Sequence, residues 1–385
     1  MLTARPTLYA IGDARDATAP LAGDARRAMR PPSPAALPAA RATLRVVGGY
    51  IERLPLAAVK CGLVDDAEAW SYVVGAAPAM AWREQPMFGR RLFRLADDRP
   101  PFHSPAMLRF LRERGAPDLL CVWGLGVSEE ILLACRDSFK LYYSLDVDPL
   151  RVPPAVSRHF DLVLVGETWQ ADAARARHPA LRCARLPIGP EFADPLTFRP
   201  LGIAKDYDVI YVACAQTYKR HDILFQALAR CARPVRTLCV FGYGELADDL
   251  RARARALGLA VDFVGPPGVP HATVNALMNR ARIGVVAGSE DGCPAILTEY
   301  MLAGLPVLAN QQLCCGLRYI TPETGLTATP EAFHLGLEEL LARAPGLDPR
   351  AHALGRWDWP TSIRKLTAIL ADCGYKPRRP IQRVN

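Results

Sequence analysis

Two carboxylates and a glycine–proline loop mark the stretch of this chain that is best equipped for chemistry. Asp291 and Glu299 stand eight positions apart, and between them the loop residues Gly292-Cys293-Pro294 lead into a run of helix-forming residues that ends at Gly304. Proline is tolerated in the first turn of a helix, so we expect a helix to begin near Pro294. The first N–H groups of a helix have no internal acceptor and attract anions. The pattern predicts a phosphate-binding helix start flanked by carboxylates that accept hydrogen bonds from sugar hydroxyls.

Such a site needs a parallel sheet to position it. The apolar run 283–287 predicts a buried strand before the loop, and 306–309 predicts the next strand after the helix. Strands alternating with helices along the chain indicate a doubly wound α/β fold. The other expected strands of this kind lie at 118–123, 140–145, 160–165, 207–213, 236–241 and 261–265.

The carboxylate pair, together with Ala303-Gly304-Leu305-Pro306-Val307, resembles the donor-site motif of the GT-B glycosyltransferases, especially the retaining family-4, or glycosyl transferases group 1, type. The resemblance implies two Rossmann-like doubly wound domains that face each other across a cleft. It also implies a metal-independent enzyme that moves a sugar from a nucleotide-diphosphate sugar to an acceptor. The family usually has a glutamate where this chain has Asp291. Glu290 is the alternative acid, at a spacing of nine from Glu299.

The same resemblance assigns the donor side. Lys219 matches a lysine that pairs with the donor diphosphate, where a cation offsets charge on the leaving group. Family members usually carry an arginine five positions earlier, where this chain has Cys214, and Arg220 is a candidate substitute. Asp291 would hold the donor sugar, Glu299 the ribose, and Gly265 would lie against the base. Asp291 and Lys219 are predicted to act in catalysis. The predicted donor-binding residues are Lys219, Arg220, Gly265, Asp291, Gly292, Cys293, Pro294, Ala295, Ile296, Leu297 and Glu299.

The acceptor side is less well marked. Gly48 and Gly49 follow an expected first strand at 43–47 and are acceptor-side candidates by resemblance, with a plain strand-to-helix turn as the alternative. Gly124 is a candidate in the turn 124–126. This glycine pair does not predict nicotinamide or flavin binding, because a third glycine and a suitably placed acidic residue are missing. Many family-4 enzymes carry a histidine near this strand; 118–126 contains none, which leaves His103 as the candidate.

Composition suggests the following domain boundaries. Residues 1–40, rich in Ala, Pro, Arg and Asp, predict a poorly ordered leader with a short helix at 21–29. We expect an acceptor domain at 41–195, a linker at 196–206 and a donor domain at 207–355. A C-terminal helix at 356–372 would cross back to the first domain, followed by a basic tail at 373–385.

The chain of 385 residues is 50% hydrophobic, which is ample for two domain cores. Its eleven cysteines are scattered without a CxxC pair, which favours reduced thiols and a cytoplasmic protein. No apolar run reaches membrane-spanning length and no signal-like segment is visible. The net charge of +8 is compatible with peripheral contact at the inner membrane face, and no nucleic-acid motif accompanies it. We expect no metal and no cofactor, a nucleotide-sugar donor, and a glycan, lipid-linked glycan or small-molecule acceptor.

Two other functions remain open from the sequence. A non-catalytic GT-B protein that binds a nucleotide sugar or a glycan would account for Cys214 and for the missing histidine, but not for the intact pair Asp291 and Glu299. A sugar-nucleotide epimerase of GT-B fold would need more acid and base groups than the sequence places near the site.

Overall fold

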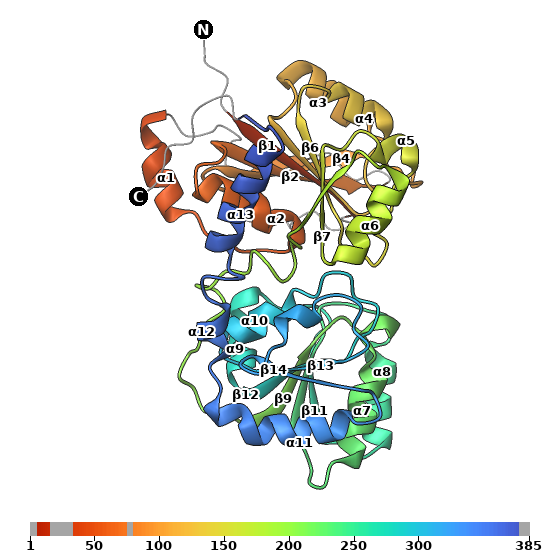
Figure 1. The fold of residues 1–385 in the computed structure, drawn as a ribbon, viewed down its shortest axis with the longest axis vertical. Coiled ribbons are helices and arrows are strands. Elements are labelled where there is room, and N and C mark those ends of the chain that lie inside the picture. The colour runs from red at the N-terminus through yellow and green to blue at the C-terminus, as the bar shows by residue number, and fades with distance from the viewer. Residues whose placement is uncertain (1–5, 16–33, 75–79, 377–385) are drawn as a thin grey trace. The chain divides into compact units, whose positions relative to one another are not determined.

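The computed structural model describes residues 6–15, 34–74 and 80–376, and the chain divides into two compact units. The first unit comprises Met1–Ile188 and Ser362–Asn385, and the second comprises Gly189–Thr361 (Figure 1). Across the described ranges, no helix combines the length and the apolar character needed to cross a membrane.

The first unit is built on an eight-stranded sheet with the order β3-β4-β2-β1-β5-β6-β7-β8. Every neighbouring pair is parallel except β3 and β4. The strands are β1 (Thr7–Arg15), β2 (Asp66–Val73), β3 (Met80–Gln85), β4 (Phe88–Arg94), β5 (Leu119–Trp123), β6 (Phe139–Tyr143), β7 (Leu162–Val165) and β8 (Arg182–Arg185). The helices are α1 (Leu37–Thr43), α2 (Tyr50–Lys60), α3 (Pro105–Arg114), α4 (Glu129–Ala134), α5 (Pro154–Ser157), α6 (Thr168–Arg177) and α13 (Trp359–Asp372).

The strand at the centre of this sheet corrects two predictions. β1 lies inside the predicted leader, and its residues Leu8 and Ala10 are fully buried between β2 and β5. The first strand expected at 43–47 is absent from the described structure, where α1 ends at Thr43 and no strand follows before α2. The backbone N–H and C=O of Arg45 instead pair with the Gln85 side-chain amide, at 2.8 and 2.9 Å. The helix predicted at 21–29 lies outside the described residues.

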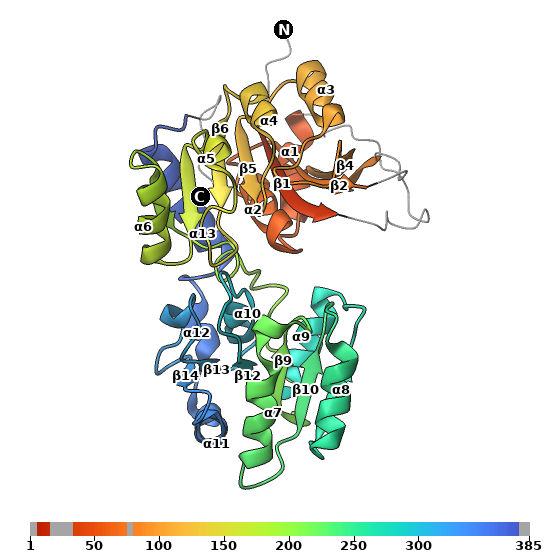
Figure 2. The same ribbon diagram turned by 90° about the vertical axis from the view of Figure 1, so that its right-hand side faces the viewer.

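The second unit contains a six-stranded, all-parallel sheet with the order β11-β10-β9-β12-β13-β14. Its strands β10, β9, β12, β13 and β14 are labelled in Figure 2. The strands are β9 (Tyr207–Val212), β10 (Thr237–Val240), β11 (Val261–Val264), β12 (Ala281–Val286), β13 (Val307–Asn310) and β14 (Gly325–Ala328). The helices are α7 (His221–Arg230), α8 (Ala247–Ala256), α9 (His271–Asn279), α10 (Ile296–Leu302), α11 (Phe333–Arg343) and α12 (Pro349–Ala353).

Alternating side chains of the central strand β9 divide the core of the second unit. Val209 and Tyr211 belong to a cluster that includes residues of α7, α8 and α11, whereas Ile210 belongs to a second cluster with residues of α9 and α10. Helices therefore cover both faces of a parallel sheet whose strands are buried on both sides. The predicted doubly wound α/β architecture is confirmed.

The segment predicted as a linker, 196–206, lies within the second unit. Phe198 is buried in its core. The backbone N–H groups of Arg199 and Leu201 donate to the side-chain oxygens of Asn275 and Asn279, at 3.0 and 2.7 Å. These bonds from α9 satisfy an extended chain that has no strand partner, so the segment is fixed to this unit.

His221, the first residue of α7, is buried among aromatic rings. Its side chain is 2% exposed, and its ring centroid lies 4.7 Å from that of Tyr211 and 5.3 Å from that of Phe241. Neither ring nitrogen has a hydrogen-bond partner among the described residues. Burial, and then the charge of Lys219, lower the pKa of His221 from 6.5 to about 4, so the imidazole is neutral at pH 7.

We expect this histidine to make the second unit sensitive to acid. Because its pKa is lower in the folded chain than in the unfolded chain, the unfolded state binds a proton first as the pH falls. The stability is then lost progressively from pH 6.5 toward pH 4, by up to about 3 kcal/mol. In His221→Leu, urea unfolding followed between pH 7 and pH 4.5 should show a shallower loss than in wild type. Parallel curves for the two proteins would contradict this assignment.

Candidate functional site

The carboxyl ends of two adjacent strands of the second unit bring two predicted site residues together. β9 and β12 pair in parallel; the loop after β9 carries Lys219, and the loop after β12 carries Asp291. Lys219 Nζ donates a hydrogen bond to Asp291 Oδ2, and the two side chains are only 17% and 10% exposed. A side chain at Gly288 would come within 3.0 Å of the Tyr218 carbonyl oxygen, so the two loops lie against each other. Parallel α/β sheets bind ligands at this edge.

The rest of the loop holds Asp291 in place. Its Oδ1 accepts a hydrogen bond from the Cys293 N–H at 3.3 Å, and its carbonyl oxygen accepts one from the Cys314 thiol at 3.5 Å. Glu290, the alternative acid, is exposed. The geometry thus favours Asp291 over Glu290 as the acid of the site.

The helix after this loop is shorter than predicted. α10 begins at Ile296, so Pro294 lies before the helix and not in its first turn, and Ala295 is the N-cap residue. At the other end, Gly304 adopts a φ of +87°, and the N–H of Leu305 bonds to the Tyr300 carbonyl at 2.8 Å. This left-handed glycine closes the helix as expected. Glu299 lies on α10 and is 7% exposed.

Tyr300 fixes α10 to the strands that carry the site. Its hydroxyl accepts a hydrogen bond from the Val212 N–H at 2.7 Å and donates one to the Ile210 carbonyl at 3.3 Å. A side chain at Gly284 of β12 would lie 2.5 Å from the Tyr300 ring, so only glycine leaves room for it. Thr298 adds a hydrogen bond to the Pro190 carbonyl at 2.6 Å.

Arg220 and Cys214 are committed to other contacts. Arg220 forms two hydrogen bonds with the Asp222 carboxylate, both at 2.9 Å. Cys214 Sγ lies 3.3 Å from the Tyr218 hydroxyl. The structure therefore brings Lys219, and not Arg220, to Asp291.

Sequence reasoning missed two tyrosines beside this site. Lys219 Nζ lies 4.7 Å from the ring centroid of Tyr218. Tyr243 follows β10 and is 62% exposed. Both tyrosines follow the carboxyl end of a buried parallel strand, a position that could have flagged them.

The remaining donor-side residues occupy neighbouring loops. Gly265 follows β11 with a φ of +75°, and its carbonyl accepts a hydrogen bond from Arg251. Cys293 Sγ accepts a hydrogen bond from the Gly189 N–H at 3.0 Å. A side chain at residue 189 would meet the Cys293 carbonyl oxygen at 2.2 Å. The loop at 291–295 is therefore packed closely against Gly189 within the second unit.

The acceptor-side candidates lie on separate elements of the first unit. Gly48 and Gly49 precede α2, where a side chain at residue 48 would lie 2.9 Å from Glu52 Cβ. The Gly124 carbonyl accepts a hydrogen bond from the Tyr142 hydroxyl at 2.6 Å. His103 Nδ1 lies 2.8 Å from Ser128 Oγ, in a loop joined to the Gly124 segment by a bridge between Phe102 and Val127.

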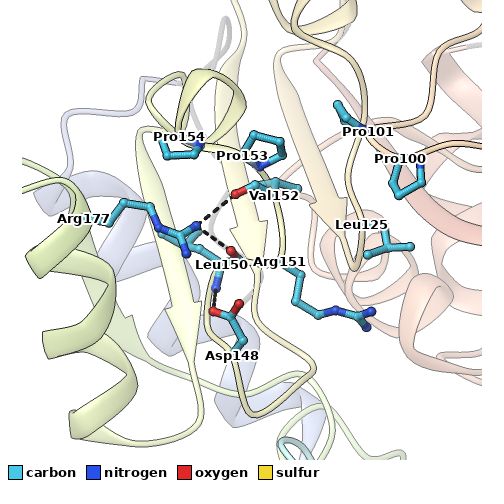
Figure 3. A pocket seen from close by; sticks show the side chains of 10 residues that line it. All are labelled: Pro100, Pro101, Leu125, Asp148, Leu150, Arg151, Val152, Pro153, Pro154 and Arg177. Atoms are coloured by element: carbon cyan, nitrogen blue, oxygen red, sulfur yellow. Dashed lines mark hydrogen bonds between the residues drawn. The ribbon is translucent and has the colours of Figure 1, made fainter.

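A pocket of about 480 Å³ in the first unit lies beside Leu125, the neighbour of Gly124 (Figure 3). Arg177 Nη1 donates to the carbonyls of Leu150 and Val152, at 2.6 and 2.9 Å. Asp148 Oδ1 accepts a hydrogen bond from the Leu150 N–H at 3.0 Å. The Arg177 and Asp148 side chains therefore bond to the backbone of the segment that lines the pocket.

Within the described part of the chain, no group of three or more His, Cys, Asp or Glu residues is arranged to hold a metal ion. Independence from metals and cofactors stays a prediction.

Comparisons with known proteins agree with this geometry. Residues 195–351 match the family described as Glycosyl transferases group 1. Sucrose-phosphate synthase from Thermosynechococcus elongatus has a TM-score of 0.65 at 17% identity, over 96% of this chain and 99% of that chain. Anabaena HepE, solved with UDP and glucose, has a TM-score of 0.64 at 14% identity, over 96% and 100%. The lipopolysaccharide outer core galactosyltransferase WaaB has a TM-score of 0.57 at 14% identity, over 95% and 99%. No curated protein matches the chain.

Residues 195–351 therefore form a glycosyl transferases group 1 domain, and the chain has the GT-B fold. The family resemblance and the fold predicted from the sequence are confirmed. All predicted donor-side residues lie inside the matched segment 195–351, and all the acceptor-side candidates lie outside it.

Removing the Tyr300 hydroxyl should loosen the donor-side helix. In Tyr300→Phe, the Val212 N–H and the Ile210 carbonyl each lose a buried partner, so the free energy of unfolding should fall by about 1–3 kcal/mol. Chemical denaturation measures this loss. Tyr243→Phe, at an exposed ring, is the matched control and should change stability by less than about 0.5 kcal/mol. Equal effects of the two variants would show that the buried hydroxyl does not anchor α10.

Proposed function

We propose that this protein binds a nucleotide-diphosphate sugar at the Lys219–Asp291 pair and transfers the sugar to a hydroxyl-bearing acceptor. The observation that carries the proposal is the contact between these two side chains at the adjacent ends of β9 and β12. HepE was solved with UDP and glucose, and the pneumococcal O-GlcNAc transferase GtfA with UDP and GlcNAc. These proteins support, for this chain, a donor made of a nucleoside diphosphate and a sugar.

Each residue of the site has a separate task in this proposal. Lys219 offsets the negative charge that develops on the leaving diphosphate. Asp291 accepts hydrogen bonds from hydroxyls of the donor sugar, and Glu299 accepts them from the ribose, since ionised carboxylates are acceptors only. Backbone N–H groups of the loop that leads into α10 face the diphosphate together with Lys219.

Two finer features belong to the proposal. Lysine and backbone N–H groups replace the divalent cation that neutralises the diphosphate in other enzymes, so transfer needs no metal. We propose, from the resemblance of the Asp291–Glu299 motif to the retaining family-4 type, that transfer retains the anomeric configuration. The acceptor is a glycan, a lipid-linked glycan or a small molecule with a free hydroxyl.

One observation favours a second candidate function. Cys214, where family members usually carry an arginine, contacts Tyr218 at 3.3 Å. A protein that binds a nucleotide sugar without transferring it would tolerate that uncharged side chain. Consumption of the donor, with and without a mixture of candidate acceptors, separates this function from transfer.

Thermal stabilisation by UDP-, GDP-, ADP- and dTDP-sugars in the presence of EDTA tests the proposed donor site. A ligand at a hundred times its dissociation constant should stabilise the fold by about 2.7 kcal/mol. We expect a shift with one nucleotide class that is lost in Glu299→Ala and retained in Glu339→Ala, an exposed glutamate of α11. No shift with any sugar nucleotide would refute the donor site. A shift that appears only after a divalent cation is added would refute metal independence.

Asp291→Asn should separate binding of the diphosphate from transfer. Without its carboxylate partner Lys219 is free to meet phosphate, so the selected nucleoside diphosphate, lacking the sugar, should bind roughly threefold to tenfold more tightly in calorimetry. Sugar transfer should fall by about a hundredfold or more, because asparagine keeps only one neutral acceptor oxygen and offers the sugar hydroxyls an NH₂ donor in place of the second carboxylate oxygen.

The matched control is Glu290→Gln, at the exposed acid next in sequence, which should leave both quantities near wild type. If Glu290→Gln abolishes transfer while Asp291→Asn does not, Glu290 is the acid of the site. Weaker diphosphate binding by Asp291→Asn would show that the carboxylate does not compete for Lys219.

A further inference from the structure

An exposed aromatic ring stands at the edge of the sheet that carries the donor site. Tyr243 is 62% exposed in the turn that follows β10. Among the exposed large hydrophobic side chains of the described second unit, Tyr243 is the aromatic one and the others are aliphatic. Exposed apolar side chains are ordinary when scattered singly, so the position of this ring matters more than its exposure.

The turn is anchored to the loop that carries Lys219. The Ala215 N–H donates to the Tyr243 carbonyl at 2.7 Å. A Cβ atom at residue 244 would lie 2.4 Å from the Ala215 carbonyl oxygen. Only glycine at this position therefore allows the turn to lie this close to the loop. On the other side of Tyr243, a side chain at Gly242 would meet nothing within 4 Å. The backbone that carries the ring is thus fixed against the loop that carries Lys219.

Neighbouring residues connect this ring to the cation of the site. Ala215, which bonds to the Tyr243 carbonyl, is preceded by Cys214, whose Sγ lies 3.3 Å from the Tyr218 hydroxyl. Lys219 Nζ lies 4.7 Å from the Tyr218 ring centroid and bonds to Asp291. The exposed ring and the Lys219–Asp291 pair therefore belong to one continuous surface.

The order of the strands gives this surface a direction. β10 is two strands away from β12, with β9 between them, which at a spacing of ~4.8 Å per strand places their ends ~10 Å apart. In a nucleotide sugar the diphosphate separates the sugar from the nucleoside. With the sugar at Asp291 after β12 and the diphosphate at Lys219 after β9, a ligand lying along the edge places its nucleoside toward β10.

We propose that Tyr243 is the platform on which the nucleobase of the donor stacks. The proposal rests on the proposed donor site and adds the residue that recognises the base. Stacking on an aromatic ring contributes about 1–3 kcal/mol per base and tolerates any base, because every base has a π face. Tyr243 therefore supplies affinity for the nucleoside, whereas the choice among bases comes from polar groups elsewhere in the site.

Isothermal titration of the full chain with UDP, ADP, GDP and dTDP, and with inorganic pyrophosphate as a probe that lacks a base, tests this role. In Tyr243→Ala the affinity for the preferred nucleoside diphosphate should fall roughly 5-fold to 150-fold. Affinity for pyrophosphate, and the rank order of the bases, should stay unchanged. Tyr243→Phe keeps the ring and should bind within about threefold of wild type, since the hydroxyl does not touch the base. Leu335→Ala, which removes another exposed side chain of the second unit, is the control.

The outcomes distinguish this inference from the function on which it rests. If wild type binds a nucleoside diphosphate and Tyr243→Ala binds it equally well, the stacking role is wrong and the donor site stands. An equal loss for pyrophosphate and for the nucleoside diphosphate in Tyr243→Ala also overturns stacking, because the variant would then have damaged the phosphate site. If wild type binds none of the nucleotides, the donor site itself fails, and the platform fails with it.

Discussion

The hydrogen-bonded ion pair between Lys219 and Asp291 is the contact on which the proposed donor site depends. Both side chains are mostly buried, and a buried charge that loses its partner is strongly destabilising. Each loop therefore holds the other in place while the site contains no ligand. The strands that precede the two loops, β9 and β12, are hydrogen-bonded neighbours. The ion pair therefore links two loops whose supporting strands are already fixed relative to each other.

Close packing at two glycines makes this arrangement of loops and strands possible. Gly284 gives the Tyr300 ring room against β12, and Gly189 lets its own backbone lie against Cys293, where a side chain would overlap the carbonyl oxygen. α10 is only seven residues long, and its place is set by the Tyr300 hydroxyl and by Thr298 more than by its own hydrogen bonds. The position of Glu299 thus follows from the contacts of its two neighbours in sequence, Thr298 and Tyr300.

The second unit could be predicted from sequence further than the first because its signals are local. Asp291, Glu299 and Gly304 lie in one short stretch, and Lys219 follows a clean apolar strand. In the first unit, charged residues conceal the strands: Glu68 of β2 accepts from Trp70 Nε1 and from Arg91 of β4, each at 2.8 Å. A buried charged side chain is compatible with a strand only when its partner is present. Neither Glu68 nor Arg91 alone therefore predicts a buried strand.

The missed strand β1 and the false strand at 43–47 have a related cause. Leu44 and Val46 are buried and alternate with polar residues, as strand residues do. The backbone between them is nevertheless satisfied by the Gln85 side chain, a partner forty positions away that no local pattern reveals. β1 is stabilised by pairing with β2 and β5, and these two strands are likewise distant from it in sequence.

On the proposed function, the charges around the donor site would couple recognition of the sugar to recognition of the diphosphate. Lys219 is engaged by Asp291, Arg220 by Asp222, and Cys214 is uncharged. A diphosphate therefore obtains the Lys219 ammonium only if Asp291 finds other hydrogen-bond donors, and sugar hydroxyls are such donors. A complete nucleotide sugar satisfies both partners at once, whereas either fragment leaves one buried charge with a poorer partner. On the proposed function the same exchange would run in reverse after transfer: once the sugar has left, Asp291 would bond to Lys219 again and weaken the binding of the nucleoside diphosphate.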